Sequence, residues 1–448
     1  MKHLLELNSG LQQAKYLQNE LKNRCRNQRE ILDFLTSLTT SIHEIRHWHD
    51  YVGTMLGFEI FWIFTEYYSR TMHVLRYLAQ NNIILNLPLK RTFYAQATDV
   101  HLNEFADFNI RRKNFIYSKL FQESNVSSDI RQIKKNNKVL YLKDIPFLEF
   151  DAEDKFKYVF LRDVPITGIS LFESLAVLTE VYSIFDMIGD EEAQLYMKKR
   201  FEHPNLWLYN SVIKSLVMAN SNVSIELMLS IISNSVTYYI GSNSKECNPA
   251  SRFIAFRNEL ASCNYPPITL EDIEEWVLEV IEKNGWSDNK KVAREQIRFC
   301  EAKIKAFESV TKDESRDLDS LEDYIILYLK EHIKYMKRYE CNVLFWASEY
   351  FYYSDHSNPP IKQIYVNRDR KWQFNSEAHL RWFSLTSIID QLFKVNREQF
   401  RCPFKGSKIC NLQSPDCGKL PLKMPPEHPE CWYLVTACEI LAPNWDFG

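Results

Sequence analysis

The stretch PITGISLFESLAVLTEVYSIFDMIGD (165–190) has a strong helical pattern. It opens with a Pro and a Gly, ends near Gly189, and carries apolar residues on every side when its positions are projected at helical steps of about 100°. A helix that is apolar all round belongs in a protein interior, because no face of it is suited to water. We therefore expect this segment to be a largely buried helix.

The whole chain shares this helical bias. It has 448 residues, of which only 10 are Gly and 16 are Pro, and 45% are hydrophobic. Few turn-forming residues and long apolar-periodic stretches favour helices, whereas segments 138–144 and 155–163 alternate like strands. The predicted fold class is mainly α with a small β element.

Two carboxylates, Glu173 and Glu180, fall on nearly the same side of this apolar helix. An ionised carboxylate that is buried without a partner costs several kcal/mol. Each one therefore needs a partner, and a metal ion would be one such partner. The alternative is that Ser170 and Glu173 form an S-x-x-E capping box near the helix start.

A second stretch, SIHEIRHWHD (41–50), is crowded with histidines and acids. His43 and His47 are four residues apart, so on a helix they share one face and each can reach a single Zn²⁺ at about 2.0–2.1 Å. Glu44 lies about a third of a turn round the helix, from where it can reach a water held by the metal. The alternative is a capping box from Ser41 to Glu44 with ordinary surface histidines, but the helical pattern begins well upstream of Ser41.

HEIRH (43–47) resembles the HExxH motif of the zincin metallopeptidases. The resemblance implies that His43 and His47 bind Zn²⁺ and that Glu44 is the general base that takes a proton from the attacking water. It covers five residues and the helix that carries them.

A catalytic zinc normally has three protein ligands and a water. The chain lacks the metzincin continuation of the motif, whereas FESLAVLTE (172–180) is similar to the helix that supplies a Glu ligand in gluzincins. That similarity implies that Glu173 is the third ligand and that Glu180 supports a histidine from outside the ligand set. Another acid, Asp50 among them, or no third ligand of this type remain open alternatives.

Two further polar residues follow the motif. Asp50 shares the helix face of His43 and His47, and we expect it to orient an imidazole from outside the ligand set rather than bind the metal. His49 points elsewhere, and we expect it in solvent or at an interface.

The C-terminal segment has a different composition, rich in Pro, Gly and Cys. Soft ligands that close a loop-rich segment are typical of a structural zinc site. The alternative is a loop with scattered thiols, because the segment lacks a C-x2-C pair. The predicted ligands of this second zinc are Cys402, Cys410, Cys417, His428 and Cys431.

These patterns predict a division into three parts. Residues 1–285 are expected to form a zincin-like catalytic region with a helical insertion, and 292–396 a helical region. Residues 397–448 are expected to form a Cys-rich tail that a structural zinc could hold together. The polar segment NGWSDNKK (284–291) is the best candidate linker.

Charge and hydropathy predict a soluble cytoplasmic protein. The N-terminus lacks the pattern of a secretory signal, and the most apolar run, 55–64, is too short to span a bilayer and contains Glu59. A net charge of −3 gives no general attraction to nucleic acid or to an anionic membrane. We expect a protein or peptide substrate and a regulatory protein partner.

Two functions compete on the sequence alone. The first is an intracellular zinc-dependent peptidase that acts on a selective protein substrate. The second is a non-enzymatic protein-interaction module, in which zinc is structural or the HExxH motif is degenerate. A carboxylate-bridged di-iron centre is disfavoured, because it needs a second E-x-x-H besides EIRH (44–47) and the chain has none.

Overall fold

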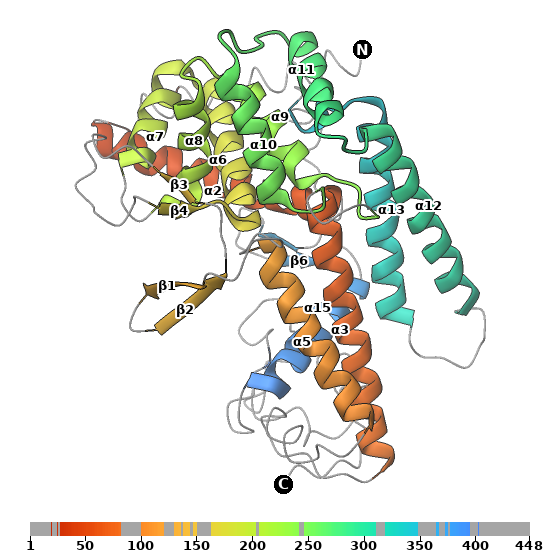
Figure 1. Ribbon diagram of the computed structural model, residues 1–448. Coiled ribbons are helices and arrows are strands. Elements are labelled where there is room, and N and C mark those ends of the chain that lie inside the picture. The colour runs from red at the N-terminus through yellow and green to blue at the C-terminus, as the bar shows by residue number, and fades with distance from the viewer. Residues whose placement is uncertain are drawn as a thin grey trace, which may run out of the picture. The chain divides into compact units, whose positions relative to one another are not determined.

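The computed structural model describes residues 19, 25, 27–81, 100–120, 130–135, 138–143, 147–149, 163–202, 206–241, 246–310, 319–347, 364–366, 372–374, 377–394 and 402. These residues are mainly helical, which confirms the predicted α class at that level (Figure 1). The helices are α2 (Gln28–Gly53), α3 (Met55–Gln80), α5 (Val100–Leu120), α6 (Gly168–Met187), α7 (Asp190–Glu202), α8 (Trp207–Ala219), α9 (Ile225–Val236), α10 (Pro249–Ser262), α11 (Leu270–Lys283), α12 (Asn289–Val310), α13 (Asp319–Cys341), the 3₁₀ helix η2 (Phe345–Ala347) and α15 (Glu377–Lys394).

Short antiparallel hairpins make up the described β structure. The pairs are β1 (Ile130–Lys135) with β2 (Lys138–Lys143), β3 (Phe147–Glu149) with β4 (Asp163–Pro165), and β5 (Ile364–Val366) with β6 (Trp372–Phe374). Strand β2 coincides with the strand expected at 138–144. Of the strand expected at 155–163, only Asp163 lies in the described part, where it begins β4.

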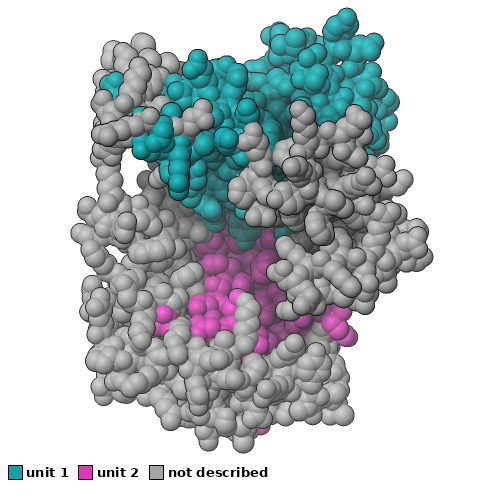
Figure 2. All heavy atoms as spheres, turned by 90° about the vertical axis from the view of Figure 1, so that its left-hand side faces the viewer, with its two compact units in different colours: residues 1–58, 116–298, 332–360 teal, residues 59–115, 299–331, 361–448 magenta. Residues whose placement is uncertain are grey.

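The chain divides into two compact units, coloured separately in Figure 2. Unit 1 comprises residues 1–58, 116–298 and 332–360, and unit 2 comprises residues 59–115, 299–331 and 361–448. Helix α2 and helices α6 to α11 lie in unit 1, whereas α15 belongs to unit 2. The motif helix and the apolar helix therefore belong to the same unit.

The three-part division expected from the sequence stays a prediction. The segment expected as a linker, 284–291, lies within unit 1 and leads from α11 into α12. Gly285 has a φ of 65° there, a left-handed conformation that favours glycine.

Helix α6 is the central helix of unit 1, because α2, α7, α8 and α9 all pack against it. Most of its residues between Gly168 and Ile184 are buried, which confirms the largely buried helix expected in 165–190. In the described part, α6 is also the one helix long and apolar enough to cross a membrane, but 72% of its most apolar window is buried inside the protein. This burial is typical of a core helix, and the soluble, cytoplasmic character expected from the sequence stays a prediction.

The first turn of α6 explains why Glu173 is available for other contacts. Thr167 is the N-cap: its Oγ1 accepts from the backbone N–H of Ser170 at 3.2 Å, and the Ser170 Oγ accepts from the backbone N–H of Thr167 at 2.8 Å. This capping box joins Thr167 to Ser170. The alternative box from Ser170 to Glu173 is therefore wrong, because the helix begins earlier than that box requires.

Helix α2 presents the HEIRH motif to α6. It begins after Asn27, whose side chain accepts from the backbone N–H of Glu30 at 3.0 Å. Ser41 consequently lies inside the helix and is not its cap. The helix ends at Gly53, where a Cβ would come within 2.0 Å of the Trp346 ring, so the close approach requires glycine. Between these ends, α2 packs along α6.

Aromatic side chains form much of the described core of unit 2. Phe61 of α3 stacks on Tyr328 of α13, and Trp382 of α15 stacks on Tyr324 with ring centroids 4.8 Å apart. Stacked aromatic pairs of this kind stabilise a core beyond their buried area. The apolar run at 55–64, which the sequence predicts to be too short to span a bilayer, contributes buried side chains to the core, Phe61 among them.

Candidate metal centre

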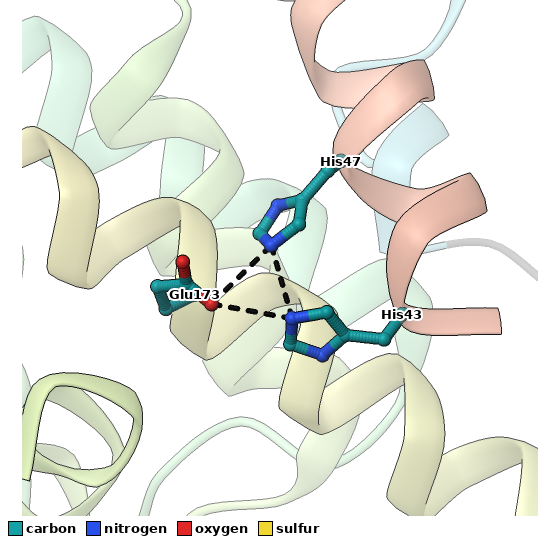
Figure 3. Close-up of side chains that lie close together, drawn as sticks. All are labelled: His43, His47 and Glu173. Carbon is teal, nitrogen blue, oxygen red and sulfur yellow. Dashed lines mark hydrogen bonds and ion pairs between the residues drawn. The ribbon is translucent and has the colours of Figure 1, made fainter. Parts of the chain in front are cut away.

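Three side chains from two helices of unit 1 converge on one point (Figure 3). His43 and His47 lie one turn apart on α2, and Glu173 faces them from α6. The Nε2 atoms of the two histidines are 3.0 Å apart. Oε2 of Glu173 lies 3.2 Å from Nε2 of His43 and 3.3 Å from Nε2 of His47. The structure thus brings together the three residues predicted as zinc ligands.

These distances suit the donors of one small cation. Zn²⁺ binds histidine nitrogen at about 2.0–2.1 Å and carboxylate oxygen at about 2.0–2.2 Å, in tetrahedral geometry. Two donors on such a tetrahedron lie roughly 3.3–3.5 Å apart. The observed triangle, with sides of 3.0, 3.2 and 3.3 Å, would need to widen only slightly to hold the ion.

The hydrogen bonds of His43 show why positive charge is needed between these donors. Its Nδ1 contacts the Glu180 carboxylate, which accepts hydrogen bonds, so Nδ1 carries a proton. In a neutral ring Nε2 is then an acceptor, yet it faces the Glu173 carboxylate and Nε2 of His47. Acceptors that face one another repel unless a proton or a metal ion lies between them.

The pKa values of His43 and Glu173 also indicate that positive charge is needed between the donors. Burial lowers the pKa of His43, but hydrogen bonds to Glu173 and Glu180 and their negative charges outweigh burial and raise it to about 9. Burial raises the pKa of Glu173, but hydrogen bonds from His43 and His47 outweigh burial and lower it to about 2. A divalent cation that binds here must therefore displace a proton.

Glu180 holds His43 from the side opposite the donor triangle. Its side chain is only 2% exposed and contacts Nδ1 of His43. It also accepts from the Tyr196 hydroxyl and, at 3.1 Å, from Nη1 of Arg200. The Tyr196 hydroxyl also lies 3.1 Å from Oγ1 of Thr39 on α2. A ligand histidine held through its second nitrogen has a fixed tautomer and orientation, which is the role expected for Glu180.

Two of these supporting residues lie on α7 and carried no sequence signal. Tyr196 and Arg200 are four residues apart, so they share one face of α7. Nη1 of Arg200 donates to the Tyr196 hydroxyl at 2.9 Å. Their i, i+4 spacing could have paired them, but nothing in the sequence indicated that this face would meet Glu180.

Glu44 and Tyr209 lie beside the donor triangle. Glu44, the predicted base, is exposed on α2 next to His43. The ring of Tyr209, on α8, lies 5.9 Å from the ring of His43. Burial raises the pKa of Tyr209, and the negative charges of Glu173 and Glu44 raise it further.

Asp50 has a different partner from the predicted one. Nε of Arg46 donates to both carboxylate oxygens of Asp50 at 3.0 Å, and both side chains are buried. Asp50 makes no hydrogen bond to His43 or His47 among the described contacts. The role of orienting an imidazole therefore has no hydrogen bond to support it.

The position expected for His49 is wrong. Its side chain is fully buried, and Nδ1 contacts the hydroxyl of Tyr335 on α13. The HEIRH face of α2 and the His49 face thus contact different helices.

Four of the five residues of the predicted structural zinc site lie outside the described residues: Cys410, Cys417, His428 and Cys431. Cys402 is described and is half-buried. The second zinc stays a prediction.

Comparisons of this chain with protein-family models, with curated proteins and with solved structures find no match. The geometry of the metal centre is therefore the basis on which a function can be inferred.

Proposed function

We propose that this protein is a zinc-dependent peptidase of the zincin type, which hydrolyses peptide bonds in a selective protein substrate. The proposal is supported by the triangle of His43 Nε2, His47 Nε2 and Glu173 Oε2. A structural zinc has four protein ligands, whereas a catalytic zinc has three and keeps one position open for water. The donor group found in the described part of the chain has three members, which favours catalysis.

Each residue of the site would have a distinct role. Zinc bound here would lower the pKa of a bound water to about 7 and polarise the substrate carbonyl. His43 and His47 would hold the ion as neutral ligands, and Glu173 would offset part of its charge. Glu44 takes the proton of the attacking water and passes it to the leaving nitrogen. His47 is 27% exposed, so the site lies where a peptide segment can reach it.

The test is the substitution Glu44→Gln, which removes the base and leaves all three donors in place. We expect the variant to keep its metal and to lose hydrolysis of a fluorogenic peptide library by about 10²–10⁴-fold. Asp33→Asn is the matched control, because Asp33 is an exposed acid on the same helix. The zinc content and the iron content of the purified protein should both be measured, because two histidines and a carboxylate also bind Fe(II).

Two results would contradict the peptidase. One is a Glu44→Gln variant that hydrolyses peptides as fast as the parent. The other is a parent protein that binds one zinc at His43, His47 and Glu173 without any hydrolysis. The second result would favour the non-enzymatic interaction module.

A further inference from the structure

The connection between α10 and α11 carries large apolar side chains on the protein surface. Tyr265 is 91% exposed and Ile268 is 79% exposed, and Leu270, the first residue of α11, is also exposed. The hydrophobic effect favours removing such side chains from water. Single exposed apolar residues are common on proteins, but a group of them at one place is typical of an interaction site.

The last turn of α8 adds to this apolar surface. Val217 and Met218 are exposed there. Asn220, the C-cap of α8, donates from Nδ2 to the backbone carbonyl of Cys263, the C-cap of α10, at 3.0 Å. The last turn of α8 is therefore held at the start of the connection between α10 and α11. We call the exposed apolar side chains of these two segments the loop patch: Val217, Met218, Tyr265, Ile268 and Leu270.

The loop patch is held in shape by local structure. Pro266 is buried and Pro267 follows it, and each proline ring fixes its own backbone φ at about −65°. Thr269 caps α11: its Oγ1 accepts from the backbone N–H of Asp272 at 3.1 Å and donates to the carboxylate of Asp272 at 2.7 Å. A surface that is ordered before binding loses little conformational entropy when a partner docks.

A stripe of carboxylates runs along α11 from the loop patch. In the described part of the chain none of them forms an ion pair, whereas Lys283, the basic residue of the last turn, pairs with Glu259 at 2.6 Å. Like charges four residues apart destabilise a helix, so this arrangement has a local cost. The members of this acidic stripe are exposed and share one helix face: Glu271, Glu275, Glu279 and Glu282.

We propose that the loop patch and the acidic stripe form a docking surface for a partner protein, which binds through a segment that combines apolar side chains with Lys or Arg. The apolar side chains of this segment cover Tyr265 and Ile268, and its positive charges lie against the stripe. Side chains on a helix lean toward its N-terminus, so the carboxylates of α11 lean toward the loop patch. A tyrosine is a frequent anchor at protein interfaces.

The negative charge of the surface disfavours other occupants. The acidic stripe repels the phosphates of an anionic membrane and of a nucleic acid. A symmetric contact with a second copy of the chain would bring two identical acidic stripes to the same interface. Electrostatic complementarity thus favours a basic protein segment.

The docking surface is separate from the donors of the metal centre. Val217 lies eight residues after Tyr209, whose ring is beside that of His43. Eight residues correspond to about 12 Å along the axis of α8. The inference therefore does not depend on the proposed peptidase.

The test starts from a displayed library of random peptides, selected on the immobilised full-length chain. We expect the enriched peptides to combine apolar residues with Lys or Arg. For a synthesised peptide of this set, Tyr265→Ser with Ile268→Ser should weaken the Kd by about tenfold or more in biolayer interferometry, mainly through faster dissociation. Glu271→Lys with Glu275→Lys should slow association and reduce its dependence on salt.

Helix α5 provides matched controls, because Glu104, Asp107 and Ile110 are also exposed there. Glu104→Lys with Asp107→Lys should leave the Kd of the peptide at the parental value, and so should Ile110→Ser. The Tm of every variant should stay close to that of the parent, because all the changed side chains are exposed.

Several results would overturn the docking surface. One is an enriched set of peptides without basic residues, and another is a peptide that binds Tyr265→Ser with Ile268→Ser as tightly as the parent. Sedimentation that shows a parental dimer and a monomeric double variant would assign the surface to a second copy of the chain. Binding of the parent, but not of the double variant, to vesicles of phosphatidylcholine and phosphatidylserine would assign it to a membrane.

Discussion

Two polar clusters join α2 to α6, and they differ in how charge is matched. In the first, Arg46 donates to the buried Asp50 and to Thr179 of α6, so donors meet acceptors. In the second, nitrogens of His43 and His47 meet the Glu173 carboxylate, and acceptors face one another. The same two helices thus carry one cluster with a permanent cation, Arg46, and one whose positive charge depends on a bound proton or metal ion.

The difference shows what separates a structural polar cluster from a functional one. Burial alone does not separate them, because Glu180 beside His43 is as buried as Asp50. A buried ion pair is complete when opposite charges are held together with good geometry. Converging acceptors become stable only when a proton or a metal ion joins them, and a site with that requirement responds to pH and to metal.

The largest effect should come from breaking the complete cluster. Arg46→Met leaves Asp50 buried without its cation, and we expect the free energy of unfolding to fall by about 3–5 kcal/mol. Urea unfolding measures this free energy with and without zinc. The loss of stability should be the same in the two conditions, because Arg46 takes no part in the metal centre. A loss that zinc abolishes would show that the two clusters are one.

A matched double variant sharpens this prediction. In Arg46→Met with Asp50→Leu, the unpaired charge is removed as well. Much of the lost stability should return, because apolar residues of similar volume can replace a buried ion pair at little net cost. A double variant as unstable as Arg46→Met alone would contradict the assignment of the loss to the Asp50 charge.

A smaller effect should come from the support behind His43. Glu180→Gln removes the negative partner of Nδ1, and zinc affinity should fall by about 10–100-fold. Competition with a chromophoric chelator measures the affinity. Thr39→Val, which removes only the outermost contact to Tyr196, is the graded control and should change the affinity less. Equal affinities for Glu180→Gln and the parent would refute a supporting role.

The smallest effect is a pH dependence that only the incomplete cluster should show. The pKa of His43 is raised to about 9 from an ordinary value of 6.5. Its proton therefore stabilises the zinc-free fold fully below about pH 6.5, and this stability is lost as pH rises through about 9. The pKa of Glu173 is lowered to about 2, so its contribution is present above about pH 4.5 and is lost as pH falls toward 2.

Urea unfolding with EDTA between pH 6 and about 10 measures the alkaline part of this dependence. In saturating zinc the trend should reverse over the same range, because a higher pH removes the proton that competes with the ion. His43→Gln is the control, which should flatten the zinc-free profile. A zinc-free parent whose stability stays constant through pH 9 would refute the proposed proton on His43.

Local patterns were enough to predict the elements that carry the site. The apolar surround of 165–190 indicated the buried α6, and the four-residue spacing of His43 and His47 indicated a shared helix face. The carboxylate spacing on α6 indicated that Glu173 and Glu180 needed partners. These features depend on neighbours within one helix, and helical periodicity alone determines them.

The partners themselves could not be predicted in the same way. Asp50 satisfied the spacing rule for the histidine face, yet it forms an ion pair with Arg46 on the same helix. Tyr196, Arg200 and Tyr209 carry no motif, and they reach the site because α7 and α8 pack on α6.

For this protein, the sequence by itself determined which residues are helical, which helix is apolar all round, and that two histidines one turn apart share a face. Only the tertiary structure decided that Glu173 meets those histidines, that Glu180 meets Nδ1 of His43, and that Tyr209 stands beside them. The physical reason is that spacing along a helix follows from backbone geometry, whereas contacts between helices depend on how whole apolar faces pack together.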